Sequence, residues 1–156
     1  MTHSDLVNIG YKWCLKRCGF AFKELVTNNI EQPDIIGFKG NYTFLLEAKS
    51  SRSDFLNDKK KVFREYPEMG MGDFRFFIIP KGLITINELP NNWGLIEVNE
   101  KGKTRLTHNP FGKGNIYSNW KNIPKDIYAE NRMMYSALRR LQIRNRVEEI
   151  YKPLNE

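Results

Sequence analysis

Three charged residues near the middle of the chain have the types and spacing of a catalytic group. Glu47 and Lys49 flank Ala48 at the end of an apolar run, and twelve residues separate Asp34 from Glu47. Side chains alternate along a β-strand, so Glu47 and Lys49 would share one face, with their α-carbons about 6.6 Å apart. The spacing therefore predicts a carboxylate and an ammonium group side by side, with Ala48 turned into the core.

A turn at Lys39-Gly40-Asn41 would bring Asp34 beside Glu47 if the flanking segments pair as a hairpin. Adjacent carboxylates repel each other, which raises one pKa unless a cation lies between them. A hard divalent ion such as Mg²⁺ or Mn²⁺ binds carboxylate oxygens, lowers the pKa of a bound water and stabilises charge on a phosphate. The lysine would hold or deprotonate that water and stabilise the developing charge. This combination predicts hydrolysis of phosphodiester bonds.

The same residues resemble a known signature. Pro33-Asp34, followed after twelve residues by Glu47-Ala48-Lys49, is similar to the motif of the PD-(D/E)XK nuclease superfamily. The resemblance implies that the aspartate and the glutamate bind Mg²⁺ or Mn²⁺ and that the lysine is catalytic. It also implies that cleavage of DNA leaves a 5′-phosphate.

The resemblance to this superfamily covers about residues 6–80. In many members a glutamate of the first helix or first strand adds a metal ligand, and Glu24 lies in a suitable place. Residues 47–61, 74–84 and 89–96 look like the small, DNA-repair-associated branch called MmcB-like, and small phage and prophage nucleases share this look. The branch implies DNA repair, recombination or phage DNA processing, in the cytoplasm of a bacterial or phage-infected cell.

Hydrophobic periodicity predicts the elements that position these residues. Leu6 to Cys18 has helical spacing and ends near Gly19, and Phe20 to Val26 alternates like a strand. Asp34 to Phe38 and Tyr42 to Ala48 read as the two strands of the hairpin.

The segment after the hairpin predicts a basic helix followed by buried strands. Ser51 with Asp54 resembles a capping box, and an apolar stripe runs from there to about Tyr66, before Pro67. The remaining predicted elements are strands over Asp73–Ile79 and Gly94–Val98, a turn over Asn99–Lys103, a loop over Asn109–Asn115, and a helix over Ile127–Ile150.

This order of elements predicts an α/β fold with a layered, mixed sheet. The resemblance to the PD-(D/E)XK superfamily implies, more narrowly, a restriction-endonuclease-like core in which helices flank a central mixed sheet in the order αβββαβ, with an extra C-terminal helix. The 156 residues favour a single nuclease-like domain, with a core of about residues 6–98 and a basic helical extension of about residues 124–151.

The charge balance favours a polyanionic partner, because 25 Lys and Arg residues exceed 18 Asp and Glu residues, giving a net charge of +7. We expect DNA, with the type of strand left open. Tyr117, Trp120 and Tyr128 could stack on bases or pack under a loop. The predicted nucleic-acid-binding residues are Arg52, Lys59, Lys60 and Arg64 on the first basic helix, and Arg139 and Arg140 on the last helix.

Several alternatives stay open. Glu47 and Lys49 could form a solvated ion pair at a strand edge, and Lys59 could reach toward the active site or turn its ammonium to water. The whole chain could be a catalytically inert, nucleic-acid-binding subunit of a repair or restriction complex, or an enzyme that acts as a homodimer. Cys14 and Cys18 favour buried thiols over a zinc site, and no apolar run approaches the length of a membrane span.

Overall fold

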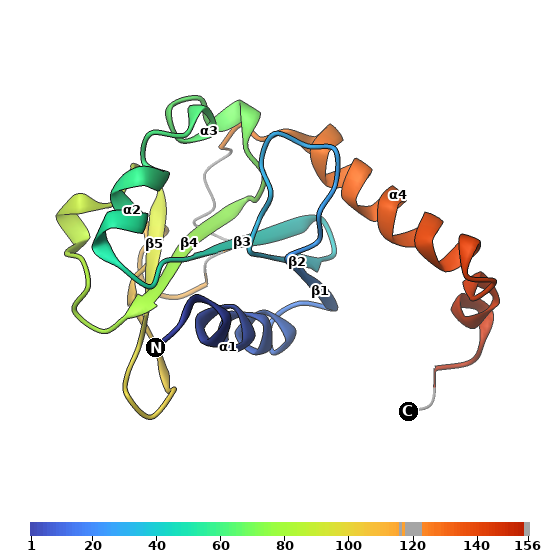
Figure 1. Cartoon of the computed structure of the whole chain (residues 1–156), viewed down its shortest axis with the longest axis horizontal. Helices are drawn as coiled ribbons and strands as arrows, with labels where there is room; N and C mark the ends of the chain where they lie inside the picture. The colour runs from blue at the N-terminus through green and yellow to red at the C-terminus, as the bar shows by residue number, and fades with distance from the viewer. Residues whose placement is uncertain (116, 118–122, 155–156) are drawn as a thin grey trace.

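The chain forms a mixed α/β fold in which helices flank a six-stranded sheet (Figure 1). A computed structural model describes residues 1–115, 117 and 123–154. The strands lie across the sheet in sequence order: β1 Phe20–Lys23, β2 Ile35–Lys39, β3 Tyr42–Ala48, β4 Phe74–Pro80, β5 Trp93–Val98 and β6 Thr104–His108. The central strands β3, β4 and β5 run parallel, and the outer pairs are antiparallel. The predicted mixed α/β sheet is confirmed.

Helices bury both faces of this sheet. α1 (His3–Leu15) packs its apolar side against one face, and α2 (Arg52–Asp58) with the first half of α4 (Ile127–Ile143) packs against the other. Strand residues supply the two cores alternately, so that Leu46 and Ala48 face α1 whereas Leu45 faces α2. The short helix α3 covers Val62–Glu65, and the 3-10 segments η1, η2 and η3 cover Pro67–Met69, Ile86–Glu88 and Val147–Tyr151.

The first helix begins earlier than its apolar pattern indicates. Thr2 and Asp5 form a capping box, with the Thr2 hydroxyl accepting from the Asp5 amide at 3.1 Å. This cap starts α1 at His3 instead of Leu6, and the helix ends at Leu15. The two cysteines near its end are free and buried, as predicted.

The predicted hairpin of β2 and β3 is confirmed, and its register fixes the position of Asp34. Ile35 lies opposite Leu46, so the next pair outward places Asp34 beside Glu47. Gly40 supplies the turn with φ = 55°, a left-handed conformation that glycine adopts without steric cost.

The single basic helix expected after Ser51 is wrong, because the chain breaks into α2 and α3 at residues 59–61. The Ser51 hydroxyl caps α2 as expected, by accepting from the Asp54 amide. At the break, the Asp58 carboxylate is buried among three cations, and the chain must turn to bring Arg64 back onto it. The break between α2 and α3 thus lets Arg64 of α3 pair with Asp58 at the end of α2.

Strand boundaries also differ at both edges of the sheet. β1 ends at Lys23 instead of Val26, since Glu24 adopts a φ of 48° that no strand continues through. The strand β6 was not predicted, because its sequence Thr-Arg-Leu-Thr-His lies at an exposed edge and lacks an apolar alternation.

The last helix is shorter than predicted and is anchored at its start. It ends at Ile143 instead of Ile150, and a separate turn of 3-10 helix follows. Within the described part of the chain, no helix is both long and apolar enough to cross a membrane. Glu130 of α4 is buried and accepts hydrogen bonds from the Thr43 hydroxyl and the Gly72 amide, which fixes α4 to the sheet.

Candidate active site

The three residues of the predicted catalytic group converge at the carboxyl end of β3. Asp34 precedes β2, and its Oδ2 accepts a hydrogen bond of 2.8 Å from the amide of Ala48. Glu47 lies in β3 and Lys49 directly follows its end, with Lys49 Nζ 3.1 Å from Glu47 Oε2. The adjacency predicted from the alternation and the hairpin is therefore present.

Glu47 and Lys49 are buried, with side chains only 2% and 5% exposed. The alternative of a solvated ion pair at a strand edge therefore does not apply. Lys49 Nζ lies equally close to a second carboxylate, 3.1 Å from Oδ1 of Asp58, which comes from the end of α2. The ammonium is thus held between a strand carboxylate and a helix carboxylate.

Arg64 completes this group from α3. Its guanidinium lies 3.3 Å from Glu47 Oε2, 2.6 Å from Asp58 Oδ2 and 2.6 Å from Oε1 of Glu31, and it stacks over Trp93 at 4.5 Å. Its side chain is 3% exposed. The expectation that Arg64 belongs to an exposed, nucleic-acid-binding surface is wrong, because four buried groups already surround the guanidinium.

The burial and charge of this cluster shift several pKa values. Burial, and then the nearby Glu47 carboxylate, raises the pKa of Asp34 to about 6. Burial also disfavours the charged form of Lys49, but Glu47 and Asp58 outweigh this cost and raise the pKa of its ammonium. Asp58 likewise resists burial, yet its hydrogen bond with Arg64 and the neighbouring cations lower its pKa to about 2. Lys49 is therefore protonated at neutral pH. Asp34, with a pKa of about 6, loses its proton only about one pH unit below neutrality.

One oxygen in the cluster has no partner. Among the described residues, Glu47 Oε1 is the buried side-chain polar atom that makes no hydrogen bond. A buried carboxylate oxygen without a partner is costly, and such an atom in a folded protein calls for an explanation such as a bound ion. Glu47 and Asp34 supply hard oxygen donors, and Mg²⁺ is commonly held by one or two carboxylates together with waters. These two residues therefore fit a divalent cation of this kind.

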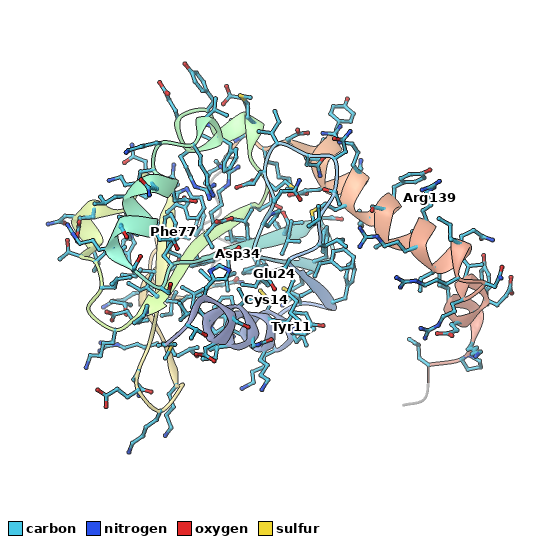
Figure 2. The ribbon with its side chains drawn as sticks, viewed as in Figure 1. Tyr11, Cys14, Glu24, Asp34, Phe77 and Arg139 are labelled. Carbon is cyan, nitrogen blue, oxygen red and sulfur yellow. The ribbon has the colours of Figure 1, made fainter. Side chains whose placement is uncertain are left out.

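Glu24, the third predicted metal ligand, lies at the exposed edge of the site, and among the described residues its side chain makes no hydrogen bond or ion pair with Asp34 or Glu47. Glu24 follows β1, and its side chain is 57% exposed, with Oε1 3.7 Å from His3 Nε2. The same imidazole nitrogen lies 3.5 Å from Asp34 Oδ1, so that His3 stands between the two carboxylates. Figure 2 shows Glu24 and Asp34 near each other, above α1. No set of three or more His, Cys, Asp or Glu side chains in the described ranges is arranged to hold a metal ion.

The predicted surface cations near this site make other contacts. Lys59 Nζ donates to the Glu88 carbonyl at 2.9 Å, so its ammonium is held against the 3-10 segment η2. Arg52 forms an ion pair with the Glu88 carboxylate. Lys60 is exposed.

The two predicted cations of the last helix lie in the second half of α4. Figure 2 shows Arg139 on the part of α4 that extends away from the sheet. Arg140 is exposed but directs its guanidinium to the Val26 carbonyl at 2.9 Å. Of the aromatic residues expected to stack on bases, Tyr117 is packed against the core and Tyr128 is 72% exposed, whereas Trp120 falls outside the described residues.

Sequence reasoning missed four residues of the cluster. Glu31, Asp58 and Arg64 form its inner layer, and His3 stands at its edge. Asp58 was hidden in the run Asn-Asp-Lys-Lys-Lys, which reads as the solvated face of a helix. No signal in the sequence marks Glu31, which comes from the loop between β1 and β2.

The comparisons with known proteins support the fold alone. No family model matches the chain, and no curated protein matches it. The chain is similar to a solved structure described as the SPO1766 protein of unknown function from Silicibacter pomeroyi, with a TM-score of 0.58 and 20% sequence identity. The match covers 100% of this chain and 99% of that chain. The two proteins therefore share an overall fold throughout their lengths.

Proposed function

We propose that this chain is a metal-dependent nuclease of the PD-(D/E)XK type, with a restriction-endonuclease-like core, that hydrolyses phosphodiester bonds of DNA. The observation that carries the proposal is the buried Glu47 Oε1, an oxygen without a partner on a residue whose neighbours are the Asp34 carboxylate and the fixed ammonium group of Lys49. The net charge of +7 supports a polyanionic substrate.

Asp34 and Glu47 would hold Mg²⁺ or Mn²⁺, and Glu24 is a candidate for a further, outer contact. The bound ion would supply Lewis acidity and a bound water of lowered pKa. Glu47 is prepared for this role by Lys49 and Arg64, which both contact Oε2 and leave Oε1 available. The positive charges of Lys49 and Arg64 on Oε2 also offset the repulsion between the adjacent carboxylates of Glu47 and Asp34.

Lys49 would act in its charged form. The surrounding carboxylates raise the pKa of its ammonium, so a proton donor, and not a general base, faces the reacting phosphate at neutral pH. Its hydrogen bonds to the attacking water and to a phosphate oxygen would stabilise the developing negative charge. Asp58 and Arg64 would position Lys49 and Glu47 without touching the substrate.

A second candidate function is binding of nucleic acid without cleavage. The observation that favours it is the saturation of Lys49, whose ammonium is already shared between the carboxylates of Glu47 and Asp58. In this case the cluster would serve only to join α2 and α3 to β3.

Cleavage assays on labelled single-stranded, duplex and branched DNA, with and without Mg²⁺, separate the two functions. We expect the wild-type chain to cut at least one substrate only with the metal. Lys49→Ala should cut about 100-fold more slowly or worse, as for loss of a transition-state donor, while still binding DNA. Equal cleavage by both proteins would remove Lys49 from the mechanism. Metal-independent binding without cleavage would favour the second candidate.

A further inference from the structure

One face of α4 carries tyrosine and arginine side chains in alternation. Tyr128, Arg132, Tyr135 and Arg139 follow one another at intervals of four, three and four residues, which places them along a single helical stripe. The stripe spans about 16 Å at 1.5 Å per residue. We call these four residues the Tyr–Arg face.

The two tyrosines of the Tyr–Arg face are turned away from the body of the protein. Tyr128 is 72% exposed and Tyr135 is 67% exposed, although they lie in the middle of a regular helix. The opposite side of α4, with Ala129, Glu130 and Met133, is the buried side. Figure 1 shows α4 extending outward from the sheet, and the exposure of Tyr128 and Tyr135 leaves their rings accessible to a large partner.

The charge on this face is positive. Glu130 is the acidic residue within α4, and it is buried against Lys125 and Thr43. Arg132 donates to Asn29 at 2.7 Å and lies 3.5 Å from Asp126, with its side chain still 52% exposed. Arg139 is exposed, and Figure 2 shows it on the outer part of α4.

We propose that the Tyr–Arg face of α4 binds single-stranded DNA. Arginine at every second position of the stripe would contact phosphates, and the tyrosine rings between them would stack on bases. Bases within a duplex are already stacked on each other, so exposed rings favour a strand whose bases are free. The choice of DNA over RNA rests on the proposed function.

The same face suits other partners poorly. Two copies of the chain that paired symmetrically through it would bring their arginines together, and like charges repel across such a contact. An apolar groove on another protein would have to strip water from the guanidinium groups of Arg132 and Arg139, and Asp126, the acidic partner of Arg132, lies 3.5 Å away at the start of α4. A polyanion with flat apolar groups meets both requirements.

Binding of a fluorescein-labelled 15-nucleotide oligo-dT, measured by anisotropy in EDTA, tests the proposal without metal or cleavage. Replacing both rings by leucine, in Tyr128→Leu/Tyr135→Leu, should weaken binding about 10-fold or more, because stacking on two bases is lost. The variant Tyr128→Phe/Tyr135→Phe keeps the rings and should bind like the wild type. Tyr66→Leu, at a 47% exposed tyrosine on the body, is the matched control and should also bind normally.

The arginines have a separate signature in the same assay. Arg132→Gln/Arg139→Gln should reduce the slope of log Kd against log salt by about 1.4, since each phosphate contact on a single strand contributes about 0.7. Circular dichroism checks that α4 is intact in every variant.

Three results would overturn the proposal. The first is equal binding of oligo-dT by the double leucine variant and the double phenylalanine variant. The second is binding of a 15-base-pair duplex, or of oligo-U, by the wild type as tight as its binding of oligo-dT. The third is a wild-type dimer, seen by light scattering, that becomes a monomer in the double leucine variant. Loss of binding in the leucine pair supports it even if the chain never cleaves DNA. Failure of the nuclease activity is thus distinguishable from failure of this inference.

Discussion

Two buried polar clusters lie at opposite ends of β3, and they differ in one respect. At the amino end, Thr43, Asp73, Lys125 and Glu130 join α4 to the sheet. At the carboxyl end, Glu47, Lys49, Asp58, Arg64 and Glu31 join α2 and α3 to the same strand.

The amino-end cluster is satisfied. Glu130 uses one oxygen for Thr43 and Gly72 and the other for Lys125, whose ammonium also contacts Asp73 at 2.6 Å. The carboxyl-end cluster has three carboxylates and two cations, yet it leaves Glu47 Oε1 without a partner. A satisfied cluster stabilises an interface, whereas an unsatisfied one retains binding capacity at a cost in stability. We therefore propose a structural role for the first cluster and, in line with the proposed function, a functional role for the second.

The largest effect should be on stability, at the amino-end cluster. Lys125→Ala removes the ammonium from between two buried carboxylates, so the free energy of unfolding should fall by about 3–5 kcal/mol, as for a broken buried ion pair. Chemical denaturation measures this change. Cleavage per folded molecule should stay at the wild-type level, in contrast to Lys49→Ala. A loss of cleavage with unchanged stability in Lys125→Ala would reverse the roles assigned to the two clusters.

A smaller effect of opposite sign is expected at Asp34. Its pKa of about 6 in the folded chain lies above its ordinary value of 3.8, so the native state binds this proton more tightly than the unfolded state does. Below about pH 4, Asp34 is protonated in both the folded and the unfolded state and does not lower the free energy of unfolding. The free energy of unfolding then falls as the pH rises from about 4 to about 6, because the folded state must give up a proton that it binds more tightly. Asp34→Asn should raise the free energy of unfolding at pH 8 by about 3 kcal/mol without metal, and leave it nearly unchanged at pH 4.

Denaturation curves of the wild type and Asp34→Asn at these two pH values provide the measurement. The amide can still accept the hydrogen bond from Ala48, which limits other effects of the substitution. If the variant were less stable than the wild type at pH 8, Asp34 would not be a strained carboxylate.

The sequence predicted the central group because local rules govern it. A turn at Gly40 and the alternation of side chains along β3 suffice to place Asp34, Glu47 and Lys49 together. The inner layer depends on tertiary contacts that no local pattern encodes. Arg64 looks like a surface residue of a basic helix until the chain breaks before α3 and buries it.

The edge strand β6 escaped prediction for a related reason. Its residues are largely exposed, so pairing with β5, and not burial, defines it as a strand. The apolar pattern on which sequence reasoning depends is absent there.

The most direct test of the functional role of the carboxyl-end cluster is metal binding by Glu47. Isothermal titration calorimetry with Mn²⁺ should show saturable binding to the wild-type chain and to the exposed-carboxylate control Glu65→Gln. Binding should be lost in Glu47→Gln, because Lys49 and Arg64 would hold the amide oxygen and the amide nitrogen would take the place of Oε1, the buried oxygen that lacks a partner among the described residues. Equal Mn²⁺ binding by Glu47→Gln and the wild type, or no binding by either, would contradict the assignment of Asp34 and Glu47 as a metal site.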